Sequence, residues 1–275
     1  MKTLEAIVLG IVQGLSEFLP ISSSAHLRIV PSLLGWSDPG TAFSAVIQLG
    51  STLAVITFFA QDLLGMLKGS FTALKSHDYM NHDLRLLIGI MIGTIPICLL
   101  GLLFRHLLEQ DQSPIRSLNV IGCASIVMGL LLFFAEQQDK QSRDLSQTGI
   151  LDGLLVGLGQ ALALIPGCSR SGSTLTAALL LGIKRSDAAK FSFLLGIPAI
   201  SLSGLLELKK LIDDGLNNEG ASALIIGFLV STIVSYLVIA WFIKFLQFHS
   251  LKVFVIYRLI FGALILILSR LSIIK

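Results

Sequence analysis

The sequence carries little charge. Charged residues make up 13% of its 275 positions, against about 25% in ordinary soluble domains. The net charge of +3 is too small to indicate nucleic acid as a partner. Hydrophobic residues reach 54%, and the mean hydropathy is +0.85. This balance excludes an ordinary soluble domain and indicates an integral membrane protein, with the bilayer as its surroundings.

Cysteine is also scarce. The three cysteines, Cys98, Cys123 and Cys168, lack the spacing of metal ligands. The sequence therefore argues against a disulfide framework and against a zinc site.

Long apolar runs predict the helices that cross the membrane. A spanning helix needs about 20 apolar residues, and the runs lack the period-two alternation of strands. Six stretches qualify: Thr41–Ala60, Leu86–Phe104, Ser117–Ala135, Ala189–Leu206, Ala221–Ile243 and Val253–Ser269. The segments between them are polar, the longest being Gln61–Arg85. We therefore predict an all-α integral membrane protein with one membrane domain over 1–275.

Two further apolar regions, Leu4–Leu34 and Ile150–Leu181, are interrupted in the middle. The interruptions are Pro20–Ser24 and Pro166–Ser169, and each half is too short to span a bilayer. We expect two re-entrant helix–loop–helix hairpins whose tips meet near the midplane. Irregular backbone at that depth is tolerated where it is buried in protein or faces a polar cavity.

The two hairpins resemble each other, which predicts an internal repeat with halves of about 1–135 and 149–275. Leu33-Leu34-Gly35 after the first corresponds to Leu180-Leu181-Gly182 after the second. Each half holds one hairpin and three spans, and an odd number of spans predicts an inverted repeat. Basic residues are slightly more numerous on the side opposite the N-terminus, which predicts that both termini lie outside the cytoplasm.

The first hairpin carries a carboxylate and an amide on one helix face, because Gln13 and Glu17 are four residues apart. Their oxygens can hold part of the shell of Mg²⁺ or Ca²⁺, which a substrate phosphate would complete. The alternative is a helix–helix hydrogen bond. Ionisable side chains at membrane depth are costly, and this favours a functional role.

Hydroxyl groups and an imidazole follow at the tip. One of Ser22, Ser23 and Ser24 is expected to cap the returning helix. Another could act as a nucleophile activated by a base. His26 is a candidate general acid or base near neutral pH, the alternative being a packing role.

The second hairpin carries a guanidinium among hydroxyls. Arg170 stays protonated, and its planar fork matches phosphate oxygens. An ion pair with Glu17 is the alternative, and the two roles are compatible. Arg258, about one turn into the last span, is expected to extend to the membrane surface. Further donors near a helix N-terminus, where anions bind readily, are Ser169, Ser171, Ser173 and Thr174.

Two motifs together resemble those of the undecaprenyl-diphosphate phosphatase family, which is also known for bacitracin resistance. They are Gln13-x-x-x-Glu17, with Ser22-Ser23-Ser24-Ala25-His26 after it, and Pro166-Gly167-Cys168-Ser169-Arg170-Ser171 through Thr174. The resemblance implies a multi-pass hydrolase of the bacterial plasma (inner) membrane. It would convert undecaprenyl diphosphate, a polyprenyl diphosphate lipid, to undecaprenyl phosphate and inorganic phosphate, and so recycle the carrier for peptidoglycan synthesis. Bacitracin would act indirectly, by sequestering the substrate.

The resemblance also implies roles for individual residues. Ser23 would be the nucleophile, His26 the acid/base and Arg170 the phosphate clamp, while Glu17 and Gln13 would form the acidic motif and hold a divalent metal. We also expect Ser22 among the groups that bind the phosphate, and a site that opens to the periplasmic or extracellular side. Attack by a metal-bound water, a transporter or flippase of an anionic polyprenyl phosphate lipid, and a homo-oligomer all stay open.

Overall fold

The computed structural model describes residues 2–109, 113–138, 142–213, 218–271 and 274, and it is almost entirely helical there. Within these ranges the one β-type pairing is an isolated bridge between Arg143 and Ile183. The α-helices are α1 (Thr3–Ser16), α2 (Ser23–Leu34), α3 (Gly40–Phe58), α4 (Ala60–Lys75), α5 (His82–Leu103), α6 (Arg105–Glu109), α7 (Leu118–Glu136), α8 (Ile150–Ala161), α9 (Arg170–Leu180), α10 (Arg185–Asp213), α11 (Asn218–Phe248) and α12 (Lys252–Arg270). Short 3₁₀ turns are η1 (Pro114–Arg116), η2 (Leu145–Gln147) and η3 (Leu162–Leu164).

The spanning helices agree with the predicted stretches. In the described residues, five helices are long and apolar enough to cross a membrane, and α3 with α4 forms a sixth if the bent pair is one span. The all-α membrane architecture is therefore confirmed. The polar connection predicted over Gln61–Arg85 is wrong in part, because it contains α4, which is bent by 69° from α3. Buried Met66, Ser70 and Ala73 recur along one side of α4, a helical periodicity that an average over the segment hides.

Both predicted hairpins are present, as α1–α2 and as α8–η3–α9. Each returning helix starts after a serine with left-handed backbone, Ser22 at φ 76° and Ser169 at φ 68°. Such a backbone costs about 1–3 kcal/mol in a residue with a side chain. Each serine hydroxyl accepts a backbone N–H from the first turn of its helix, and this offsets part of the strain.

Small residues let the hairpins pack closely on spanning helices. Gly153 and Gly157 of α8 lie against Gly89 and Gly93 of α5, and a Cβ added to Gly157 would stand 2.1 Å from the Gly93 carbonyl oxygen. Gly10 brings α1 similarly close to α11. This small-xxx-small packing is typical of membrane helices, which gain little from hydrophobic burial against one another.

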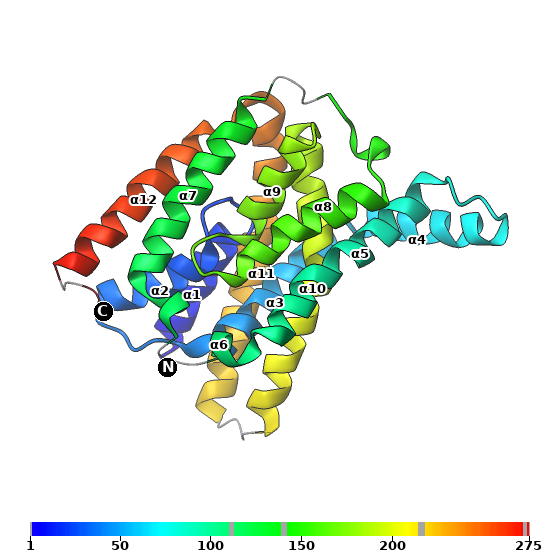
Figure 1. Cartoon of the computed structure of the whole chain (residues 1–275). Coiled ribbons are helices and arrows are strands. Elements are labelled where there is room, and N and C mark those ends of the chain that lie inside the picture. The colour runs from blue at the N-terminus through cyan, green and yellow to red at the C-terminus, as the bar shows by residue number, and fades with distance from the viewer. Residues whose placement is uncertain (1, 110–112, 139–141, 214–217, 272–273, 275) are drawn as a thin grey trace.

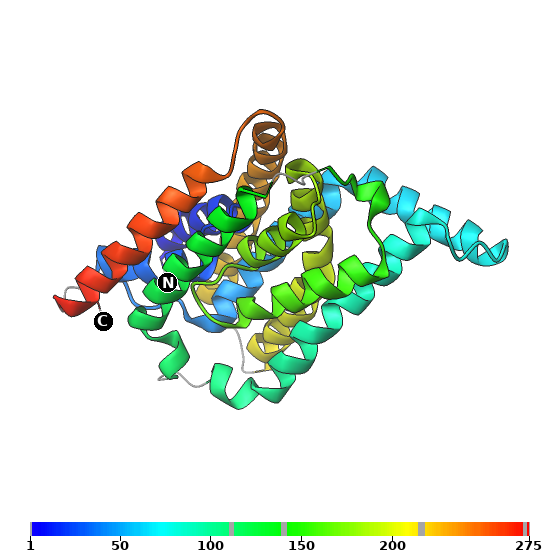
Figure 2. The same cartoon turned by 45° about the horizontal axis from the view of Figure 1, so that its top comes forward.

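The packing joins distant parts of the chain. Helix α1 contacts α11, α8 contacts α5, and α7 contacts α12. Figures 1 and 2 show α7 and α12 side by side, with α5 on the other side of the molecule. The two hairpin tips thereby reach the interior of the bundle. Both returning helices follow a capping serine. The internal repeat and its inverted orientation stay predictions.

Candidate active site

Glu17 is the centre of a polar cluster at the tip of the first hairpin. Its side chain is 2% exposed, yet its carboxylate accepts four hydrogen bonds. Oε2 accepts from Gln13 Nε2 at 2.8 Å and from Ser23 Oγ at 2.7 Å. Oε1 accepts from Gln48 Nε2 at 3.0 Å and from Arg170 Nη2 at 3.3 Å. The structure thus brings three predicted site residues, Gln13, Ser23 and Arg170, together around the carboxylate of a fourth.

The amide of Gln48 was missed from the sequence. Gln48 lies on α3, inside a stretch predicted to span the membrane, and a polar side chain in such a run is itself a signal of function. Gln13 is further held by a donation to Ser51 Oγ at 3.4 Å. Ser51 also contacts Ser231 and Ser235 of α11 at 3.0 and 2.9 Å. This buried hydroxyl chain fixes the amide that orients Glu17.

Arg170 reaches Glu17 from the first residue of α9, so the ion pair considered from the sequence is present. Its Nη1 donates to the Ser192 carbonyl at 3.3 Å, while Nε is buried without a partner among the described residues. A Cβ on Gly196 of α10 would lie 1.7 Å from Arg170 Nη1. Gly196 therefore provides the space that the guanidinium occupies.

Arg258 joins the two tips and corrects the prediction made for it. Its side chain is fully buried and does not extend to the membrane surface. It donates from Nη1 to the Pro20 carbonyl at 3.0 Å, and from Nη2 to the carbonyls of Gly167 and Cys168 at 2.7 and 3.1 Å. Its Nε donates to the Ser125 carbonyl at 3.2 Å. The prediction failed because both loops bend their carbonyls toward α12, which no local pattern reveals.

Two of the predicted phosphate-binding hydroxyls serve as helix caps here. Ser22 Oγ accepts from the Ala25 amide at 3.4 Å, and Ser169 Oγ accepts from the Gly172 amide at 3.1 Å. Ser171 donates to the Leu19 carbonyl at 3.0 Å, which ties the second tip to the first. These contacts order the loops around Glu17.

The other predicted hydroxyls lie deeper in the protein. Thr174 Oγ1 lies 2.5 Å from Ser192 Oγ and donates to the Arg170 carbonyl at 2.8 Å. Ser173 Oγ is buried and has no partner among the described residues. Thr174 bonds to the backbone of Arg170 and the Ser173 hydroxyl is buried, so direct contact of either hydroxyl with a phosphate stays a prediction.

His26 lies outside the Glu17 cluster. Its Nδ1 is 2.7 Å from the Ser22 carbonyl, and its Nε2 is 2.6 Å from the Tyr257 hydroxyl. The ring stacks on Phe261 at 4.3 Å. Because a carbonyl only accepts, Nδ1 carries a proton. The structure therefore places Glu17, not His26, next to the Ser23 hydroxyl.

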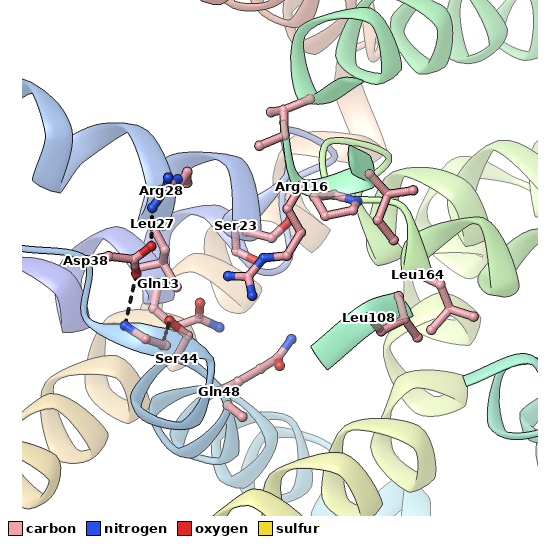
Figure 3. Close-up of a pocket in the computed structure, with 16 residues that line it drawn as sticks. Gln13, Ser23, Leu27, Arg28, Asp38, Ser44, Gln48, Leu108, Arg116 and Leu164 are labelled. Carbon is pink, nitrogen blue, oxygen red and sulfur yellow. Dashed lines mark hydrogen bonds and ion pairs between the residues drawn. The ribbon is translucent and has the colours of Figure 1, made fainter. Parts of the chain in front are cut away.

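A pocket of about 270 Å³ leads to this cluster. Figure 3 shows Gln13, Ser23 and Gln48 around it, with Leu108 and Leu164 on another side and the Arg28–Asp38 pair at its edge. The remaining lining residues are Ser24, Leu27, Gly40, Ser44, Ala45, Ile115, Arg116, Ile121 and Pro166. One part of the wall is polar and another is apolar. Such a lining fits an amphiphile with a polar head and a hydrocarbon chain.

Comparisons with known proteins agree with the two motifs. The family model described as bacitracin resistance protein BacA matches residues 6–264. A relative from Gloeobacter violaceus, named undecaprenyl-diphosphatase, is 58% identical over 95% of this chain and 90% of its own length. Relatives of the same name from Synechococcus elongatus and Trichormus variabilis are 56% and 55% identical, over 95% and 97% of this chain and 91% and 83% of their own lengths. The chain therefore belongs to the bacitracin resistance protein BacA family.

Proposed function

We infer that this protein is a membrane-bound undecaprenyl-diphosphatase, a hydrolase that converts undecaprenyl diphosphate to undecaprenyl phosphate and inorganic phosphate. The observation that carries the inference is the hydrogen bond of 2.7 Å from Ser23 to Glu17. Ser23 lines a pocket with polar and apolar walls, and Glu17 also accepts a hydrogen bond from Arg170. A nucleophile, a base and a phosphate-binding cation are the groups that phosphoryl transfer needs. The relatives' common name supports the same substrate.

The contacts favour Ser23 as the attacking group. Its Oγ forms a bond to the terminal phosphorus, the bond from that phosphorus to the bridging oxygen breaks, and undecaprenyl phosphate leaves. Glu17 takes the hydroxyl proton, because its Oε2 already accepts the Ser23 hydrogen bond. Water then hydrolyses the phosphoserine and releases inorganic phosphate.

Arg170 stabilises the charge of the phosphoryl group. It holds Glu17 through one hydrogen bond of 3.3 Å, and its Nε has no partner among the described residues, so donors are available to an incoming phosphate. His26 stays a candidate acid for a later proton transfer. Because both of its ring nitrogens are already engaged, this role requires the Tyr257 contact to exchange.

A divalent metal, Mg²⁺ or Ca²⁺, is part of the proposal, with Glu17 and Gln13 as its protein ligands. No group of three or more His, Cys, Asp or Glu side chains gathers within the described residues. Two oxygens from the protein still fit Mg²⁺, which often binds through one or two side chains plus substrate phosphates. One of the four donors at Glu17 has to give way. When bound, the metal would neutralise phosphate charge.

The site is proposed to open to the periplasmic or extracellular side. Asp38 and Arg116 line the pocket and lie in connections that the predicted topology places on the side of the N-terminus. The excess of basic residues on the other side supports the cytoplasm there. Bacitracin would then act indirectly by binding the lipid diphosphate.

Phosphate release by the purified protein tests this function. Undecaprenyl diphosphate in detergent should yield inorganic phosphate, and a chelator should stop the release until Mg²⁺ or Ca²⁺ is restored. Ser23→Ala should remove turnover, while Ser44→Ala, another hydroxyl lining the pocket, should retain it. Wild-type protein that moves the lipid across the bilayer of proteoliposomes without releasing phosphate would instead identify a transporter. Full turnover in Ser23→Ala would eliminate the covalent route.

A further inference from the structure

Arg116 points into the pocket from the segment between α6 and α7, far from both hairpin motifs in sequence. It is the last residue of η1, is half-buried and lines the pocket. Figure 3 shows its guanidinium extending over the cavity toward the space among Ser23, Gln13 and Gln48. No carboxylate or carbonyl in the described chain is bonded to this guanidinium. Within the described residues its donors are therefore not used by a protein partner, and the guanidinium lines the cavity.

The charges around the pocket make this guanidinium distinctive. Arg28 pairs with Asp38 at the pocket edge, and Arg170 pairs with Glu17 behind Ser23. Each pair is close to neutral as a unit. Arg116 is thus the cation at this wall, within the described residues, whose charge no neighbouring carboxylate cancels. A bound anion gains most from such a charge because the pocket wall is partly apolar.

The position of Arg116 fits the lipid-attached phosphate of a lipid diphosphate better than the terminal phosphate. Arg170 and Glu17 adjoin Ser23, so they meet the terminal phosphate that Ser23 attacks. Arg116 directly follows Ile115, which together with Leu108 and Leu164 forms the apolar part of the wall. A prenyl chain that follows the apolar wall would bring the phosphate attached to it next to Arg116.

We propose that Arg116 binds the lipid-attached phosphate of the substrate, and that the same phosphate keeps this contact in the lipid monophosphate product. The proposal rests on the proposed function and adds a binding residue that neither motif contains. During cleavage the guanidinium also faces the negative charge that develops on the departing phosphate. Charge-assisted hydrogen bonds of this kind contribute a factor of about 10 to 100 in affinity.

The test compares Arg116→Gln and Arg116→Lys with the wild type in the phosphate-release assay. We expect Arg116→Gln to raise KM for undecaprenyl diphosphate about 10- to 100-fold, and Arg116→Lys to recover part of that loss. Inhibition by added undecaprenyl phosphate should weaken in parallel. Inhibition by inorganic phosphate, which would occupy the terminal position near Arg170, should change little. Arg270→Gln, at the exposed end of α12, is the matched control.

The outcomes separate this proposal from the proposed function. A wild-type protein that releases no phosphate would contradict the hydrolase itself. Normal wild-type turnover with unchanged KM and unchanged product inhibition in Arg116→Gln would overturn only the role of Arg116. Weaker inhibition by inorganic phosphate alone would also overturn it, because Arg116 would then face the terminal phosphate.

Discussion

Replacing Arg258 with methionine should separate the two hairpin tips. Methionine fills much of the same volume without the four donors that reach Pro20, Gly167, Cys168 and Ser125. The Ser125 carbonyl lies inside α7 and keeps its helical partner. The three loop carbonyls are left unsatisfied in a buried setting, because no other backbone donor reaches them in the described loops.

The magnitude follows from these three carbonyls. A buried acceptor without its partner costs about 1–3 kcal/mol, hence about 3–9 kcal/mol for three. The substitution also removes the desolvation penalty of a buried cation, which is several kcal/mol. We therefore expect a net loss of roughly 1–4 kcal/mol in the free energy of unfolding. Activity should fall further, since misplacing reacting groups by about 1 Å lowers a rate by about 10²-fold.

Thermal unfolding and phosphate release in the same detergent measure the two effects. Arg258→Lys keeps the charge but lacks the planar fork, so it should be intermediate in activity. Arg270→Met, at an exposed position of the same helix, should leave both measurements unchanged. Wild-type turnover in Arg258→Met, with an unchanged melting temperature, would refute the assignment of Arg258 as the link between the tips.

Three further substitutions test the proposed base, the space around Arg170 and the close packing of α8 on α5. Glu17→Gln should reduce kcat by at least about 10²-fold while the protein stays folded, because the base at Ser23 is lost; near-normal kcat would reassign the base. Gly196→Ala should lower kcat/KM and leave the melting temperature nearly unchanged, because its Cβ would stand 1.7 Å from Arg170 Nη1 and displace the guanidinium. Unchanged kinetics would show that activity does not depend on this position of the guanidinium. Gly157→Ala should instead lower the melting temperature, since its Cβ would meet the Gly93 carbonyl oxygen at 2.1 Å; a stable variant would contradict the close helix contact.

Much of this architecture follows from local patterns. Apolar runs of spanning length, and the prolines that interrupt two of them, predict the spans and the hairpins directly. Gln13 and Glu17 share a helix face by spacing alone, and a serine at a helix start caps it. These features depend on neighbours along the chain, and the structure agrees with them.

The remaining features depend on which helices meet. Gln48 joins Glu17 because α3 packs beside α1, and Gly196 matters because Arg170 lies against α10. The sequence around Arg258 is compatible with a side chain at the membrane surface and with one that bonds to two buried loops. Hydrophobic periodicity therefore cannot decide between the two placements. His26 shows the converse: it is near Ser23 in sequence, but its nitrogens bond to Ser22 and Tyr257.

The contact of the first hairpin with α11 and α12 has a consequence for biosynthesis. Glu17 and Gln13 enter the membrane early, whereas the surfaces that enclose them are translated last. Until α11 is inserted, Gly10 and Gly14 of α1 lack the helix against which they pack. Until α12 is inserted, the Pro20 carbonyl lacks the hydrogen bond from Arg258. A nascent chain halted before α12 would therefore hold most of its helices and still have no competent catalytic centre.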